Sequence, residues 1–185
     1  MAVPILNLSP DRSFLLLVDF QRPFLNAIAG GEQVLQRAKF LAHCANALGV
    51  PVFATEHCPS KLGIFDPELG SLCQLVTPKS TFSAHRSQPI LAGQVVVAGV
   101  ETHICVSQTV RDLRTAGHDV VVVEDAVSAR TVEMHRSGLA RVGNYGAEVA
   151  HSEAVVYEWL GTADHPKFRE VLGHLKAHQA SASID

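Results

Sequence analysis

Apolar and polar positions alternate along the chain in blocks of two kinds. Short continuous apolar runs rich in Val and Leu, such as those at 14–18, 95–98 and 120–123, have the length and composition of strands buried on both faces. Longer blocks repeat their apolar residues at helical spacing, most clearly over 33–48, where Gly49 follows as a suitable C-terminal cap. This alternation predicts an α/β fold, a three-layer α/β/α structure around a mostly parallel sheet of about six strands.

The same pattern gives approximate limits for each element. The expected strands are 14–19, 51–55, 75–77, 94–98, 119–124 and a brief one at 148–150. The expected helices are 33–48, a short one from Ser83 to Leu91, one that starts near Cys105, then 131–145, 152–160 and 165–178. Prolines and glycines mark 58–72 as a long loop, and 180–185 is expected to be a frayed tail. Nothing divides 1–185, so we expect a single domain with its core at about 13–178.

Composition narrows the class of protein. The chain is 47% hydrophobic and 18% charged, with a formal net charge of -3, which is ordinary for a soluble globular protein. The absence of a basic block argues against a nucleic-acid partner, and the apolar runs are too short to cross a membrane. No positive segment followed by an apolar stretch opens the sequence, so a cytoplasmic location is expected.

The cysteines and histidines show no ligand pattern. Four cysteines lack CxxC spacing, which favours reduced thiols, and ten scattered histidines form no metal-binding motif. We therefore expect neither a metal nor another cofactor.

Three polar side chains lie where predicted strands end. Asp19 closes the first strand, Lys79 follows the third, and Cys105 opens the helix after the fourth. In a parallel sheet these positions meet at one edge, where they would supply a base, a cation and a nucleophile. The first turn of a helix also favours thiolate over thiol at Cys105. The alternatives are a cysteine that merely packs in the core and an Asp19–Lys79 ion pair that is only structural.

Four segments together resemble one known family. They are 19–24, with a D-x-Q-x-x-F pattern, then 79–83, 99–106, and 125–130, with a D-A-x-x-S/A-R pattern. Their order and spacing, from about residue 13 to 160, are similar to those of the isochorismatase-like cysteine hydrolases, which include nicotinamidases and N-carbamoylsarcosine amidohydrolases. The loop 55–69 and the segment 165–168 look most like isochorismatase-domain-containing proteins, whose substrates are largely unassigned.

The resemblance implies a Rossmann-like isochorismatase fold and a role for each matching residue. Asp19 would be the general base, Lys79 the cation and Cys105 the nucleophile. A cis peptide between Val100 and Glu101 would aim the Glu101 N–H beside the Cys105 N–H as an oxyanion hole. The resemblance thus implies an enzyme that cleaves an amide or ureido C–N bond of a small molecule through a thioester intermediate. It also implies assembly as a homodimer or homotetramer.

Other residues are weaker candidates or depart from the family pattern. Phe24, Thr102 and His103 are candidates for the substrate pocket, although Thr102 also suits a helix cap. Asp125 is expected to fix its own turn. The stretch 55–59 lacks the Asp and His that nicotinamidases use for a metal, which makes nicotinamide a poorer candidate substrate, and the presence of Cys105 argues against vinyl-ether cleavage.

Two readings compete with the hydrolase. The first is a catalytically silent family member that acts as an interaction protein, and the second is a redox sensor with a thiol of low pKa at Cys105. The redox reading requires Cys58 or Cys73 to lie near Cys105 in space.

Overall fold

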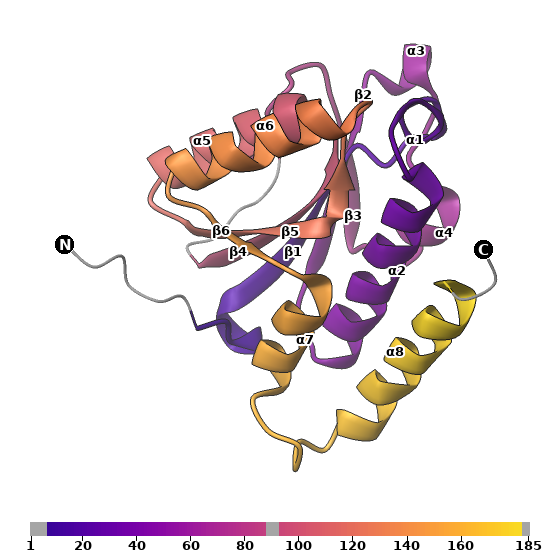
Figure 1. The fold of residues 1–185 in the computed structure, drawn as a ribbon, viewed down its shortest axis with the longest axis vertical. Helices are drawn as coiled ribbons and strands as arrows, with labels where there is room; N and C mark the ends of the chain where they lie inside the picture. Colours follow the sequence, from indigo (N-terminus) through magenta and orange to yellow (C-terminus); the bar gives the residue numbers. More distant parts are fainter. Residues whose placement is uncertain (1–6, 88–92, 183–185) are drawn as a thin grey trace.

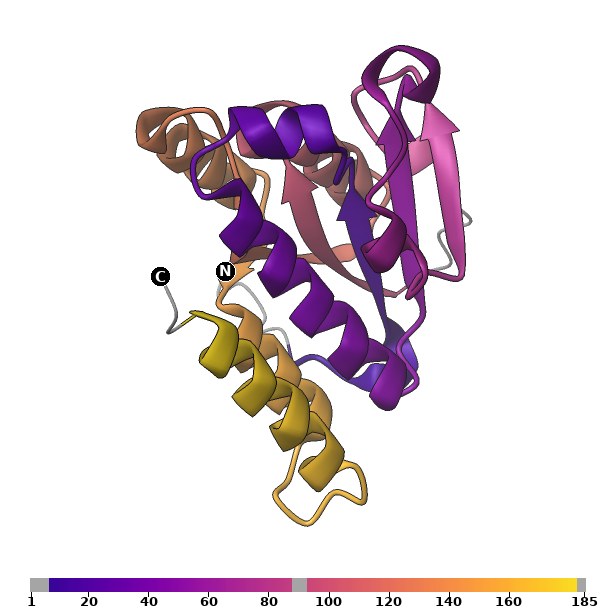
Figure 2. The same cartoon turned by 90° about the vertical axis from the view of Figure 1, so that its right-hand side faces the viewer.

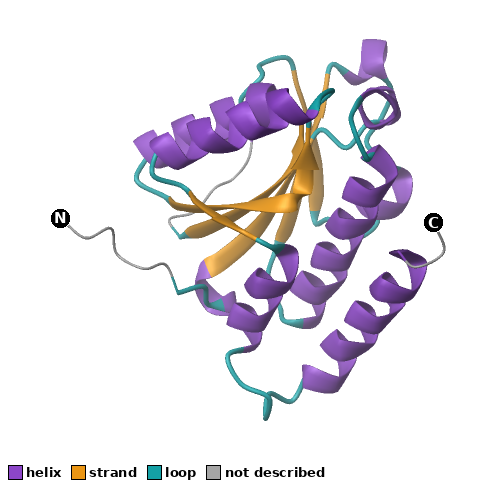
Figure 3. Ribbon diagram, in the orientation of Figure 1, coloured by secondary structure: helices purple, strands orange, loops and turns teal. Residues whose placement is uncertain are grey.

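A six-stranded parallel sheet lies between two layers of helices in the computed structural model, which describes residues 7–87 and 93–182 (Figures 1 and 3). The strand order is β3-β2-β1-β4-β5-β6, and every neighbouring pair is parallel. The predicted α/β/α architecture is therefore confirmed. In the described part of the chain, no helix is both long enough and apolar enough to cross a membrane.

The elements follow each other in regular alternation. The strands are β1 (Ser13–Val18), β2 (Val52–His57), β3 (Leu75–Lys79), β4 (Gln94–Val100), β5 (Asp119–Ser128) and β6 (Glu148–Ala150). The α-helices are α1 (Arg22–Ala27), α2 (Gly31–Ala47), α3 (Pro59–Leu62), α4 (Pro67–Gly70), α5 (Ser107–Thr115), α6 (Val132–Asn144), α7 (Ser152–Leu160) and α8 (Phe168–Ala182). Two 3-10 turns, η1 (Pro10–Arg12) and η2 (His85–Ser87), and a π-helix, η3 (Thr102–Val106), complete the described elements.

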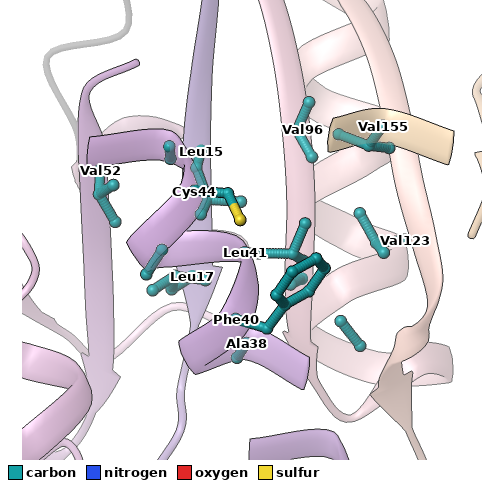
Figure 4. Close-up of a cluster of buried hydrophobic side chains, with 14 of the residues drawn as sticks. Leu15, Leu17, Ala38, Phe40, Leu41, Cys44, Val52, Val96, Val123 and Val155 are labelled. Carbon is teal, nitrogen blue, oxygen red and sulfur yellow. The ribbon is translucent and has the colours of Figure 1, made fainter. Parts of the chain in front are cut away.

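The helices divide between the two faces of the sheet. Helices α5 and α6 cover one face, whereas α2 and α7 cover the other, with α8 lying against α2 (Figures 1 and 2). Strand residues point alternately to the two faces of the sheet, and each face carries a cluster of buried apolar side chains. Leu15 and Leu17 belong to the first cluster, on the α2 side, whereas Leu16 and Val18 belong to the second, on the other face. Figure 4 shows Leu41 and Cys44 of α2 among the side chains of the first cluster. Burial on both faces explains the continuous apolar runs.

The predicted limits differ from the structure mainly in short elements. The segment 58–72 is not entirely loop, since α3 and α4 each begin with a proline, the residue best suited to the first helical position. In place of the helix expected from Ser83 to Leu91 there is only η2, and 88–91 lie outside the described residues. Helix α8 continues to Ala182, so 180–182 are helical rather than frayed, and 183–185 are not described.

Candidate active site

The strand order places β1 and β4 side by side at the point where the direction of sheet growth reverses. In open α/β sheets a ligand crevice forms here, at the carboxyl ends of the strands. The two strands approach closely at Gly99, whose φ of +148 and whose neighbour Val18 leave no room for a side chain: a Cβ would lie 2.4 Å from the Val18 carbonyl oxygen. Glycine thus lets β4 deliver the following residues next to the residue that ends β1.

That residue is Asp19, which is fully buried and has a φ of 60. Asp tolerates this left-handed conformation better than most residues. Its carboxylate accepts hydrogen bonds from Thr55 Oγ1 at 2.8 Å and Lys79 Nζ at 2.6 Å. The charge at the end of an apolar strand is therefore fully partnered within the protein.

Lys79, the last residue of β3, reaches across β2 to Asp19. Its ammonium also donates to the carbonyl oxygens of Thr81 and Phe82, each at 3.1 Å. These three bonds use all three protons of the ammonium group. The buried pair is thus satisfied on the lysine side and rigidly held.

Cys105 lies in the π-helix η3, which joins β4 to α5. Cys105 thus lies near the start of the helical segment after β4, as predicted, but that first turn is a π-helix and α5 begins only at Ser107. The peptide bond between Val100 and Glu101 is cis. Cys105 is 6% exposed, and its thiol hydrogen-bonds with Asp19. Asp19, Lys79 and Cys105 are therefore brought together by three separate parts of the chain.

The environment of Cys105 favours the thiol over the thiolate. Burial is the main cause that raises the pKa of Cys105, and the negative charge of Asp19 raises it further, while Lys79 acts in the opposite direction. The expectation that the thiolate is favoured is therefore wrong, since a helix terminus cannot offset burial beside a carboxylate. Burial also raises the pKa of Asp19, although Lys79, Thr55 and Cys105 oppose the rise. The thiol proton consequently rests beside a basic carboxylate that can accept it.

A cavity of about 180 Å³ opens onto the thiol. Its lining consists of Phe24, His57, Leu62, Phe82, Val100, Glu101, Ile104 and Cys105. The rings of His57 and Phe82 are stacked, with centroids 5.4 Å apart, and Phe24 lies tilted against His57 at 6.5 Å. One wall of the cavity is thus built from flat rings.

The structure separates the three residues that the sequence suggested for the substrate pocket. Phe24 lines the cavity, whereas neither Thr102 nor His103 is among its described lining residues. Thr102 is fully buried and pairs with His135 Nδ1 at 3.0 Å. The alternative that it caps a helix is wrong, because Glu101 occupies the N-cap position of the π-helix. Sequence reasoning gave no role to His57 and Phe82, because their place depends on how loops fold over the sheet edge.

Two further residues support the site without having been predicted to do so. Thr55 binds Asp19 as described above. Gln21 is fully buried, and its amide clamps the backbone of His57, accepting from the N–H at 2.6 Å and donating to the carbonyl at 3.0 Å. Its place in the D-x-Q pattern was the available signal.

Glu56, one of the residues that depart from the nicotinamidase pattern, has a structural role. Glu56 accepts a hydrogen bond from the Phe65 N–H at 2.9 Å. Within 7–87 and 93–182, no three His, Cys, Asp or Glu side chains are grouped so as to hold a metal ion. The idea that Asp125 fixes its own turn is wrong, because its carboxylate binds the N–H and hydroxyl of Ser152 and so holds the start of α7.

Helix α6 packs closely against the π-helix at Gly138, where a Cβ would lie 2.8 Å from Thr102 Cγ2 and 2.9 Å from the His103 nitrogen. We expect Gly138→Ala to push η3 and Cys105 out of place, lowering stability by about 1–3 kcal/mol and slowing any reaction of the thiol. Gly143→Ala in the same helix is the matched control, because its Cβ meets nothing within 4 Å. Urea unfolding and Cys105 alkylation rates measure both effects, and equal behaviour of the two variants would contradict the prediction.

Comparison with known proteins gives consistent matches. The isochorismatase domain matches residues 13–154. Isochorismatase domain-containing protein 2 of Xenopus laevis is 36% identical over 173 residues, which cover 89% of this chain and 84% of the relative. Isochorismatase domain-containing protein 1 of Salmo salar is 34% identical over 186 residues, and the match covers 96% of this chain but only 66% of the salmon protein.

Solved structures give the same result for the fold. A structure described as MAR1 ribonuclease from Caenorhabditis elegans is similar with a TM-score of 0.84 and 29% identity, covering 91% of this chain and 92% of the other. YcaC from Pseudomonas aeruginosa, described with hexane-2,5-diol and covalent acrylamide, has a TM-score of 0.84 at 21% identity and covers 98% of each chain.

Proposed function

The chain belongs to the isochorismatase family, and from this we propose that it is a cysteine hydrolase cleaving the amide or ureido C–N bond of a small molecule. One observation carries the proposal: the thiol of Cys105 faces a cavity and is in contact with the Asp19 carboxylate, which Lys79 binds from the other side. An acid, an ammonium and a sulfur meeting at a cavity form a nucleophile with its base.

The proposed reaction begins with transfer of the thiol proton to Asp19. The Cys105 sulfur attacks the substrate carbonyl, and the oxyanion is stabilised by the backbone N–H groups of Glu101 and Cys105. Asp19 returns the proton to the leaving nitrogen, so the C–N bond breaks and a thioester remains. Water that gives up a proton to Asp19 then hydrolyses the thioester, and the returning proton restores the thiol. Because the pKa of Cys105 is raised, the resting thiol keeps its proton until a carbonyl is in place.

The rival readings have less support in the geometry. A redox sensor needs a thiol of low pKa with a resolving cysteine nearby. Here the pKa of Cys105 is raised, and neither Cys58 nor Cys73 is among the described residues that line its cavity. Burial also raises the pKa of Cys73 to about 12. An interaction protein without activity has no need of a buried Asp19–Lys79 pair held against a thiol.

The direct experiment incubates the purified protein with small primary amides, ureas and carbamates and measures released ammonia. Mass spectrometry of the quenched reaction should find the acyl group on the peptide that contains Cys105. Single-stranded RNA is included as a separate substrate, because the C. elegans structure is described as a ribonuclease. RNA cleavage that survives in Cys105→Ala, without amide hydrolysis, would overturn the proposal.

The pH dependence of Cys105 alkylation is a second test. With a raised pKa, the rate should still increase above about pH 10, where the alkylation rate of an ordinary cysteine has levelled off. Asp19→Asn removes a negative charge and should move the curve to lower pH. Acrylamide suits the measurement, since it is described as covalently bound in the P. aeruginosa structure. A plateau near neutral pH in the unmodified protein would contradict this prediction.

We also expect the protein to assemble as a homodimer or homotetramer. YcaC from Escherichia coli, similar in fold at 19% identity, is described as an octameric hydrolase of unknown specificity. Sedimentation measurements on this protein would determine its oligomeric state.

A further inference from the structure

Glu101 is one of the residues that line the cavity beside Cys105. Its side chain is only 12% exposed, and its Oε2 accepts hydrogen bonds from Arg130 Nε at 3.0 Å and from the Arg130 backbone N–H at 3.3 Å. The Arg130 side chain is 51% exposed and so lies on the solvent side of the pair. Glu101 is held in place, and its charge is only partly compensated from outside.

Apart from the imidazole of His57, the other described lining residues offer no side chain that can carry a positive charge. No Lys or Arg is among the described lining residues, five of which are purely apolar: Phe24, Leu62, Phe82, Val100 and Ile104. The nearby ammonium of Lys79 has its three donors committed to Asp19 and two carbonyl oxygens. The proposed Glu101 and Cys105 N–H donors are taken by the oxygen of the reacting carbonyl, so a further negative charge on the acyl group would lose its hydration and find no partner except the ring of His57.

The charge of Glu101 also reaches the reacting sulfur. Its negative charge is one of the causes that raise the pKa of Cys105. The same field disfavours a further negative charge on the acyl group, which has no backbone N–H groups left to stabilise it. Glu101 thus acts where the acyl group of a substrate would bind.

We propose that the cavity accepts a small uncharged acyl group with a flat apolar face, and that the Glu101 carboxylate excludes acyl groups that carry negative charge. The inference rests on the proposed hydrolase function and narrows its substrate class. An apolar cavity of about 150 Å³ can hold benzene, so the cavity of about 180 Å³ fits one six-membered ring with its amide. The stacked rings of His57 and Phe82 provide the matching flat wall.

Iodoacetamide and iodoacetate test the charge selectivity, because they deliver the same carbon with the same leaving group and differ in charge. At about pH 8, where an ordinary histidine is neutral, Cys105 should prefer iodoacetamide about tenfold more strongly than free cysteine does. Glu101→Gln should remove most of this extra preference. The ratio of the two rates cancels the accompanying change in thiol pKa, since both reagents need the thiolate.

Arg130→Gln should shift the ratio of the two alkylation rates in the opposite direction. It removes the partner that partly compensates Glu101, so the preference for iodoacetamide should increase. Glu148→Gln, an exposed carboxylate on the edge strand β6, is the matched control and should leave the ratio unchanged. If Glu101→Gln and Arg130→Gln change both rates equally, the two residues are only structural and the inference fails.

This experiment separates the inference from the proposed function, because alkylation requires no hydrolysis. A shifted ratio in a protein that hydrolyses no amide would refute the hydrolase and keep the charge selectivity. An unshifted ratio in an active hydrolase would refute the charge selectivity and keep the hydrolase. In an active protein, Glu101→Gln should also raise kcat/KM for 4-carboxybenzamide about tenfold relative to benzamide.

Discussion

Asp19→Asn is expected to lower kcat/KM for amide hydrolysis by at least about 10³-fold, within the range for loss of a general base. The amide cannot accept the thiol proton or return it to the leaving nitrogen, although it keeps the size of the carboxylate and its single oxygen can still accept one of the two bonds from Thr55 and Lys79. The raised pKa of Cys105 makes this loss larger, because little thiolate exists without the base.

Alkylation of Cys105 distinguishes loss of the base from damage to the fold. In Asp19→Asn the removal of a negative charge lowers the pKa of the thiol, so alkylation near neutral pH should not slow while hydrolysis is lost. Asp119→Asn is the control. Asp119 begins β5, so it lies at the amino end of a strand, away from the site at the carboxyl ends, and its side chain is 46% exposed. More than about a tenth of the activity remaining in Asp19→Asn would be inconsistent with a general base.

The sequence predicts the sheet better than it predicts the small elements, for a physical reason. Strands such as β4 are buried along their whole length and therefore read as uninterrupted apolar runs. Helix α1 buries only Leu25, so it leaves no periodic pattern to detect. The two helical turns in 58–72 depend on contacts made after the chain has folded.

The candidate site is predictable in its members but not in its electrostatics. Asp19, Lys79 and Cys105 follow from the rule that parallel strands end at one edge. The raised pKa of Cys105 does not, because burial and the distance to Asp19 are properties of the folded chain. Glu101 illustrates the same limit: the motif identifies its backbone, whereas only the structure shows that Arg130 binds its carboxylate and that its charge acts on Cys105.

The second large effect concerns stability. Lys79→Met leaves the fully buried Asp19 carboxylate without its cation, and we expect the free energy of unfolding to fall by about 3–5 kcal/mol. The double variant Asp19→Asn/Lys79→Met removes both charges and should recover most of the loss. Lys167→Met, which breaks an exposed pair with Glu170, should cost about 0.5 kcal/mol or less.

The loss in Lys79→Met should also depend on pH in a defined direction. Burial already raises the pKa of Asp19, and removal of Lys79 removes the main opposing cause, so the folded variant binds a proton more tightly than the unfolded chain does. Its stability is therefore highest below the ordinary pKa of an aspartate and is lost as pH rises through the folded pKa of Asp19. Urea unfolding of the variant and the unmodified protein at several pH values should show the difference between them shrinking as pH falls. Two results would contradict this explanation: a difference that stays constant with pH, or a double variant no more stable than Lys79→Met. Either would mean that the stability is lost through packing of the lysine side chain and not through the unpaired Asp19 carboxylate.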